Sequence, residues 1–104
     1  MTVICPPPPN KATFTTVHLT GEIDLATKDA LRNQLLRALR RTAGLLVLDL
    51  SAVSFCDASG LGVIVGVQRR ARVRGVAVAV TAPRPAMTRL LRITGLDRSL
   101  PTLV

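Results

Sequence analysis

The residues best placed to do chemistry lie in the stretch FCDASGLG at positions 55–62, where an apolar segment meets Asp57, Ser59 and then a long apolar and basic segment. If a helix begins here, Ser59 lies beside backbone N–H groups that have no partner within the helix, at the positive end of the helix dipole. Such a position stabilises a phosphate group, and phosphorylation of Ser59 would add nearly two negative charges next to Asp57. The alternative is that Asp57 or Ser59 simply caps the helix, as both residue types commonly do.

Catalysis and metal binding find little support elsewhere in the chain. A serine nucleophile needs a base beside it, and His18 is the only histidine. We expect His18 to be a surface or edge residue of a strand rather than a catalytic base. Cys5 and Cys56 are far apart in the sequence and have no metal-ligand spacing, so neither a metal nor another cofactor is expected.

Three glycines follow the serine, at positions 60, 62 and 66. Their spacing is GxGxxxG rather than the GxGxxG of dinucleotide-binding loops, so we expect no bound nucleotide. Gly60 and Gly62 are instead predicted either to allow close packing at the helix start or to permit a tight turn and the close approach of a partner. Upstream, Glu22 and Asp24 lie at a turn from strand to helix, where Asp24 is predicted first of all as a cap.

The charge of the chain is strongly positive, with 14 Lys and Arg against 6 Asp and Glu and a net charge of +8. This balance is typical of proteins that bind nucleic acid, an acidic membrane surface or an acidic protein. The basic run QRRARVRG (68–75) has no aromatic residue for stacking on bases, so we expect no direct nucleic-acid binding. No apolar run approaches the ~20 residues of a membrane span and the N-terminus has no signal-peptide pattern, so we expect a cytoplasmic protein with no membrane contact.

Alternating strand and helix patterns predict the organisation of the whole chain as one domain, residues 1–104. The composition is 48% hydrophobic but only 2% aromatic, which predicts an aliphatic core. Residues 1–12 are expected to form a short edge strand at 2–5 and a rigid proline-rich turn at 6–9. The later elements are expected to be the strand Thr13–Thr20 ending at Gly21, the helix Ala26–Arg41 ending at Gly44, the strand Leu45–Leu50, a loop at 51–57, the helix Ser59–Arg74 ending at Gly75, the strand Val76–Val80, the helix Arg84–Thr94 ending at Gly95 and a last strand Leu100–Val104. This order predicts an α/β fold with helices packed on a mixed sheet of four to five strands.

The faces of the helix that begins at Ser59 follow from its rotation of about 100° per residue. Leu61, Ile64 and Val65 are predicted to face the sheet. The opposite face would carry Ser59, Val63, Gly66 and Arg70, with Val67 at its edge. We predict that this second face is exposed and forms a docking surface for another protein.

The segment LLVLDLSAVSFCDASGLGVIVGVQRRARVRG (45–75) resembles the STAS domain of bacterial anti-sigma factor antagonists, in which an Asp-Ser-Ser-Gly or Asp-Ser-Thr-Gly corner joins a buried strand to a helix. LTGEIDLAT (19–27) and RLLRITGLD (89–97) are also similar to that family. The resemblance covers most of the chain, with the elements in the right order. Family members usually continue into a further helix after the position of Val104, and the lack of one here implies that one side of the sheet is less covered.

The resemblance implies a regulatory function in transcription. Members of the family bind an anti-sigma factor that is also a serine kinase, and the sigma factor is thereby released. The kinase phosphorylates a serine at the helix corner and breaks the complex, and a phosphatase resets it. Carried over to this chain, Ser59 would be the phosphoacceptor, and the partner-binding residues would be Asp57, Ala58, Gly60, Gly62, Val63, Val67 and Arg70, with a contribution from Glu22 and Asp24. A monomer or a weak dimer is expected.

The chain departs from the family pattern at one position. The phosphorylated serine of the family directly follows the aspartate, where this chain has Ala58. Either Ser59 takes the phosphate with a shift of one residue, or the corner cannot be phosphorylated and the protein is a constantly active antagonist. A further alternative is a STAS subunit without a switch, for example on an ATPase or in a stressosome-like assembly.

Overall fold

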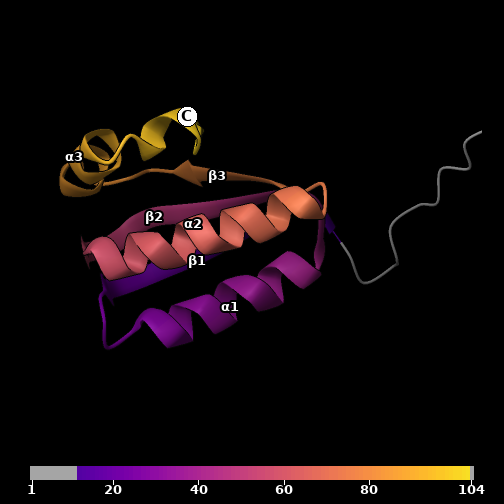
Figure 1. Ribbon diagram of the computed structural model, residues 1–104, viewed down its shortest axis with the longest axis horizontal. Coiled ribbons are helices and arrows are strands. Elements are labelled where there is room, and N and C mark those ends of the chain that lie inside the picture. Colours follow the sequence, from indigo (N-terminus) through magenta and orange to yellow (C-terminus); the bar gives the residue numbers. More distant parts are fainter. Residues whose placement is uncertain (1–11, 104) are drawn as a thin grey trace, which may run out of the picture.

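The computed structural model describes residues 12–103, along which strands and helices alternate (Figure 1). The first elements are β1 (Ala12–Ile23), α1 (Lys28–Arg40), β2 (Thr42–Cys56) and α2 (Ala58–Val73). They are followed by β3 (Ala77–Thr81), α3 (Pro85–Ile93), a short 3-10 helix (Leu96–Arg98) and β4 (Thr102–Leu103). The strand predicted at 2–5 and the turn predicted at 6–9 lie outside the described residues.

The four strands form one sheet in the order β1-β2-β3-β4, and all neighbouring strands are parallel. Parallel neighbours need a crossover connection, and α1, α2 and α3 supply one each. Figure 1 shows α1 and α2 side by side across one face of the sheet. The predicted α/β fold class is confirmed, and the antiparallel strand that a mixed sheet requires is not found among residues 12–103.

A continuous aliphatic core lies between this face of the sheet and the helices. Alternate residues of β2, namely Leu46, Leu48 and Leu50, are fully buried in it, as the side-chain period of a strand requires. Leucine, isoleucine and methionine side chains of all three α-helices complete the same cluster. Both phenylalanines lie outside it, because Phe14 is 55% and Phe55 is 52% exposed. The predicted aliphatic core is therefore confirmed.

The two long strands extend further than their sequence patterns predicted. β1 continues past Gly21, which has a φ of 78° and lies where the pairing register shifts. β2 continues through the predicted loop at 51–57 as far as Cys56, because it stays paired with β1, with Glu22 opposite Phe55. The prediction of a loop after Leu50 was therefore wrong. As a result, the last residues of both strands lie at the start of α2.

The helix ends follow the glycines in two cases out of three. Gly75 and Gly95 have φ values of 76° and 77° directly after α2 and α3, which confirms them as helix stops. Gly44 is not a stop, because α1 ends at Arg40 and Gly44 lies in β2. A Cβ at Gly44 would lie 2.7 Å from the carbonyl oxygen of Thr13, so glycine allows the close approach of β1 there. Within the part of the chain described, no helix is long and apolar enough to span a membrane.

Candidate protein-binding site

Asp57 connects the last residue of β2 to the first residue of α2 and holds this corner in place. Its carboxylate accepts a hydrogen bond from the Gly60 N–H at 3.1 Å, which confirms that it caps the helix. Its own N–H donates to the carbonyl of Ile23 at the end of β1, at 3.0 Å. Its carbonyl accepts from the Leu61 N–H at 3.1 Å. The start of α2 is thereby attached to the ends of both β1 and β2.

Gly60 closes the same corner by packing. It is buried, and a methyl group in its place would overlap the Cγ2 atom of Ile23 and lie 3.1 Å from the Sγ atom of Cys56. The prediction that Gly60 allows the close approach of a partner was wrong, since the group that approaches it is the chain's own Ile23. A methyl group at Gly62 would meet no heavy atom within 4 Å, so the space around that residue is open.

Ala58 and Ser59, the first two residues of α2, are both at least partly accessible. Ala58, the first residue of α2, is exposed, and Ser59, the second, is half-buried. Their backbone N–H groups belong to the first turn of the helix, where no carbonyl of the helix itself can accept from them. Among the residues the structure describes, α2 has no acidic side chain in its first turn, and the carboxylate of its cap residue, Asp57, already accepts from Gly60. The helix start is therefore suited to a phosphate on an accessible hydroxyl.

The predicted docking face of α2 is only partly exposed. Val63 and Val67 are 4% and 2% exposed and belong to the core, so the prediction that they form a surface was wrong. The rotation of the helix correctly placed Leu61 and Ile64 against the sheet. It could not reveal that α1 packs along the flank of α2 and covers the two valines. Gly62, Gly66 and Arg70 remain exposed on that side.

The turn before α1 is built around Asp24, as the sequence predicted. The Asp24 carboxylate accepts hydrogen bonds from the N–H groups of Ala26 and Thr27, at 3.0 and 3.1 Å. The Asp24 N–H donates to the Thr27 hydroxyl oxygen at 2.9 Å. These bonds confirm Asp24 as a cap of the turn. Glu22 is exposed and lies opposite Phe55 in the sheet, at the same end as the start of α2.

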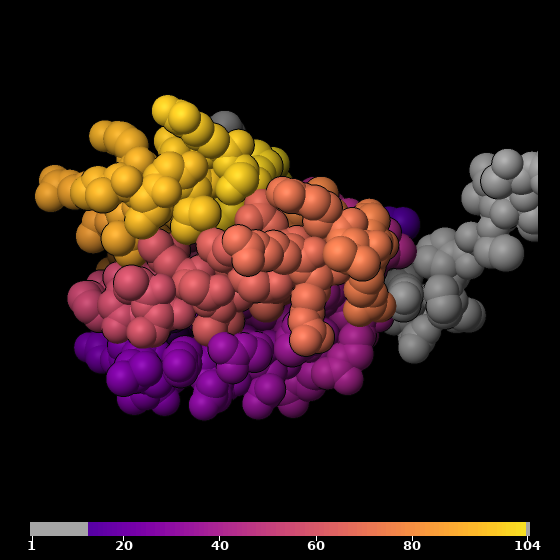
Figure 2. Space-filling model, in the orientation of Figure 1, coloured from indigo at the N-terminus to yellow at the C-terminus, as the bar shows by residue number. Residues whose placement is uncertain are grey.

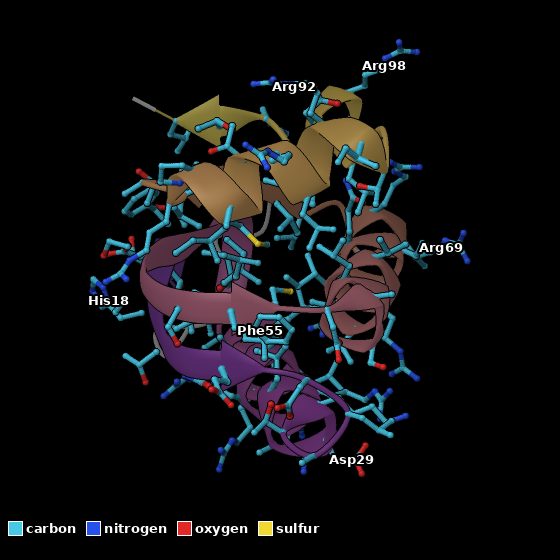
Figure 3. All side chains as sticks on the ribbon, turned by 90° about the vertical axis from the view of Figure 1, so that its left-hand side faces the viewer. His18, Asp29, Phe55, Arg69, Arg92 and Arg98 are labelled. Carbon is cyan, nitrogen blue, oxygen red and sulfur yellow. The ribbon has the colours of Figure 1, made fainter. Side chains whose placement is uncertain are left out.

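Sequence reasoning missed an apolar surface at this end of the sheet. Leu25, Phe55 and Ile93 are 67%, 52% and 74% exposed. Phe55 and Ile93 line a hollow of about 430 Å³ between the end of β2 and α3. Figure 3 looks onto this end of the molecule, with Phe55 near its centre. The available signal was that Phe55, one of only two aromatic residues, directly precedes the corner.

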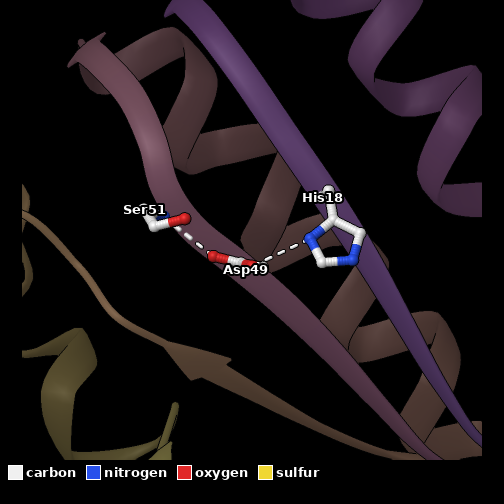
Figure 4. A network of polar contacts seen from close by, with 3 residues as sticks. All are labelled: His18, Asp49 and Ser51. Atoms are coloured by element: carbon white, nitrogen blue, oxygen red, sulfur yellow. Dashed lines mark hydrogen bonds and ion pairs between the residues drawn. The ribbon is translucent and has the colours of Figure 1, made fainter.

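His18 and Asp49 form a polar contact on the sheet face away from the helices (Figure 4). The His18 Nδ1 atom lies 2.8 Å from Asp49 Oδ2, and the His18 side chain is 72% exposed, as expected of a surface residue. The Ser51 N–H donates to Asp49 Oδ1 at 2.9 Å. The hydrogen bonds from Ser51, and after them His18, hold the pKa of Asp49 below its ordinary value. This network uses Ser51 rather than Ser59, so it provides no base for the serine of the corner.

Cys56 is free and half-buried behind the corner. Burial, and after it the neighbouring Asp57 carboxylate, raises the pKa of the thiol to about 11. The thiol is therefore protonated at neutral pH and is a poor nucleophile. Across residues 12–103, no three His, Cys, Asp or Glu side chains gather closely enough to hold a metal ion. The exposed apolar residues at this end of the sheet offer a surface for binding.

Comparison with known proteins supports this interpretation. Residues 11–104 match the family described as "Mlab, STAS domain". The anti-sigma F factor antagonist of Paenibacillus polymyxa is 40% identical over 86 residues, which cover 82% of this chain and 74% of that protein. The chain therefore belongs to the STAS domain family.

Solved structures of relatives have the same fold. An anti-sigma factor antagonist from Mycobacterium paratuberculosis matches with a TM-score of 0.73 and 31% identity, over 86% of this chain and 76% of that one. The anti-sigma factor antagonist SpoIIAA in its unphosphorylated form matches with a TM-score of 0.71 and 22% identity, over 89% of this chain and 83% of that one. SpoIIAA has also been solved in the phosphorylated form. These relatives are regulatory proteins.

Proposed function

We propose that this protein is an anti-sigma factor antagonist, which binds an anti-sigma factor with serine-kinase activity and so releases a sigma factor for transcription in the cytoplasm. The observation that carries the proposal is the capped start of α2 at the same end of the sheet as exposed apolar side chains, Leu25, Phe55 and Ile93. Exposed apolar groups around a polar centre are typical of a protein-binding surface. The antagonist relatives at 40% and 31% identity support the same partner class. The protein acts by binding and performs no chemistry itself.

We further propose that Ser59 is the phosphoacceptor of this site. Its hydroxyl is on the second residue of α2, where the helix dipole favours a phosphate. Since Asp57 is only two residues away and already uses its carboxylate on the Gly60 N–H, the phosphate adds charge beside an existing anion. A partner surface matched to the unmodified corner would then meet a doubly charged group that lacks a counter-ion. The complex would weaken without any change of fold.

The test is incubation with candidate anti-sigma kinases of the same genome and ATP, followed by intact-mass measurement, mapping of the modified residue and binding assays. Ser59→Ala is the loss-of-site variant, and Ala58→Ser is the matched variant that places a hydroxyl directly after Asp57. We expect phosphate on Ser59, none on Ser59→Ala and loss of kinase binding after modification. Phosphate elsewhere in the chain would overturn the assignment of Ser59.

One observation favours a second function, a STAS subunit without a switch. The most accessible position of the corner is Ala58, which has no hydroxyl, whereas Ser59 is half-buried. The same experiment separates the two functions. Stable binding without phosphate would mean an antagonist that is not switched off in this way. No binding to any anti-sigma factor would favour a subunit of another assembly, for example one that contains an ATPase.

A further inference from the structure

A groove runs between α1 and α2, on the helical side of the molecule. Near the start of α2 its walls include the exposed Gly62 and Gly66, and further along they include Arg40, Arg70 and Val73. The two parts enclose about 140 and 590 Å³ and share lining residues, so the groove is continuous along α2. Figure 2 shows the line between α1 (purple) and α2 (salmon) crossing the front, with side chains from the later part of α2 (orange) extending over it.

The wide part of the groove has an apolar floor. Both residues of its floor come from α1: Leu36 is half-buried and Leu39 is buried. Val73, on the last turn of α2, is 89% exposed, the highest value among the large exposed hydrophobic residues of the described chain. An apolar side chain left this accessible at the rim of a groove gains free energy when a partner covers it, by about 25 cal/mol for each Å² removed from water.

The rim of the groove is positively charged on both sides. Arg32 and Arg40 come from α1, and Arg70 and Arg74 come from α2. Within residues 12–103, Arg32 is the only arginine with a carboxylate partner, Asp29, at 3.0 Å. The guanidinium groups of Arg40, Arg70 and Arg74 therefore face one opening without an anion of the chain between them. An acidic partner would remove their mutual repulsion.

The narrow part of the groove is open for a close approach. A methyl group added at Gly62 or Gly66 would meet no heavy atom within 4 Å, so packing within the domain does not require either glycine. Glycine is a poorer helix former than alanine, so each of them lowers the stability of this helix. The groove therefore has three properties of a helix-binding site, namely open space, an apolar floor and two charged rims.

We infer that this groove binds an acidic amphipathic helix of the anti-sigma factor, with apolar side chains on Leu36 and Val73 and carboxylates on Arg40, Arg70 and Arg74. The inference rests on the proposed function and adds to it a second contact. Arg70 is eleven residues beyond Ser59 in α2, which places it about 16 Å along the helix axis. The contact is therefore separate from the phosphorylated corner. A second copy of this chain is a poor occupant, because it presents the same positive charge.

The test compares two double variants of the full-length chain in titration calorimetry with the anti-sigma factor. Arg70→Glu with Arg74→Glu changes the groove. Arg69→Glu with Arg72→Glu is the matched control on the same helix, since neither residue lines the groove and Figure 3 shows Arg69 directed outward. Both pairs lower the net charge of +8 by four. We expect the groove pair to raise Kd at least about tenfold and the control pair less than about threefold.

The outcomes separate the groove from the proposed function. If both pairs of substitutions weaken binding equally, the effect is one of net charge and the inference is overturned. If neither pair weakens binding, the inference is also overturned. In both cases the antagonist function stands. No binding by the unmodified chain would overturn both. Binding of a short duplex DNA that only the groove pair abolishes, with the anti-sigma factor unaffected, would assign the groove to nucleic acid instead. A charge swap tests the contact directly. If changing acidic residues of the partner to arginine restores its affinity for the groove pair, the direct contact is supported.

Discussion

Three consecutive residues at the start of α2 have different surroundings. Ala58 is exposed, Ser59 is half-buried, and Gly60 is buried against Ile23 and Cys56. The sequence predicted that this corner matters and that either Asp57 or Ser59 could cap it, because both residue types are typical of a helix start. It could not predict which glycine is structural, since the answer depends on Ile23, which lies far away in the chain and meets Gly60 only in the folded sheet.

The contrast between two glycines leads to a stability prediction. Gly60→Ala should lower the free energy of unfolding by about 1–3 kcal/mol, because the methyl group overlaps Ile23. Gly62→Ala should raise it by up to about 1 kcal/mol, because the site is open and alanine is the better helix former. Urea unfolding followed by circular dichroism measures both. A Gly60→Ala variant as stable as the original chain would contradict the packing described for the corner.

The Cys56 thiol leads to a prediction about pH. Its pKa is raised from 9.0 to about 11 in the folded chain, so the fold favours the protonated form. The unfolded chain loses this proton first as the pH rises, and stability should therefore be intact below 9.0 and fall as the pH approaches 11. Cys56→Ala should remove this part of the decline in thermal unfolding measured across the alkaline range. Both variants carry Cys5→Ser, so that Cys56 is the only thiol that titrates in the chain that keeps it. An identical decline of Tm with and without Cys56 would contradict the prediction.

At the scale of the elements, local patterns predicted the helices better than the strands. α2 and α3 lie within one residue of their predicted bounds, because glycines with positive φ stop both helices. β2 was predicted to end at Leu50, where the continuous apolar run LLVLDL ends. It continues because β1 pairs with it, which is a tertiary effect that the run itself does not contain. The burial of Val63 and Val67 was missed for the same reason, since it depends on α1.

The extension of β2 makes a testable difference between two phenylalanines. Phe55 lies at the end of β2 beside the corner, whereas Phe14 lies near the opposite end of the neighbouring strand, and their exposures are similar at 52% and 55%. Phe55→Ala should weaken binding of the anti-sigma factor at least about tenfold, because exposed aromatic residues at a binding surface contribute much of the affinity. Phe14→Ala should leave the affinity within about twofold. Equal effects in a surface-binding assay would remove the end of the sheet from the proposed interface.

At the scale of the whole molecule, charge is the property that the fold distributes most unevenly. The chain carries 14 Lys and Arg against 6 Asp and Glu. In the described residues the only ion pairs are His18 with Asp49 and Arg32 with Asp29. Composition alone predicted an acidic partner as one of three possibilities. It could not predict that the arginines of α1 and α2 would face a common groove, because their positions become adjacent only when the two helices pack.

This imbalance predicts how stability depends on salt. Repulsion among unpaired cations lowers the stability of the compact state, and added salt screens it. Tm should therefore rise between low and high NaCl concentrations in thermal unfolding followed by circular dichroism. Arg70→Glu with Arg74→Glu should make the rise smaller, because it reduces the repulsion at one place. A Tm that falls as NaCl is added would mean that attractive contacts dominate the surface.

The attachment of Asp57 to the end of β1 has a consequence for how such a switch evolves. Because the N–H of Asp57 is bonded to Ile23 and Gly60 is packed behind it, the backbone of the corner is set by residues other than 58 and 59. Those two positions are free to exchange side chains without disturbing the fold. A single codon change can therefore delete the hydroxyl at position 59 or add one at position 58. Deletion would convert a reversible regulator into a permanent one within an unchanged scaffold.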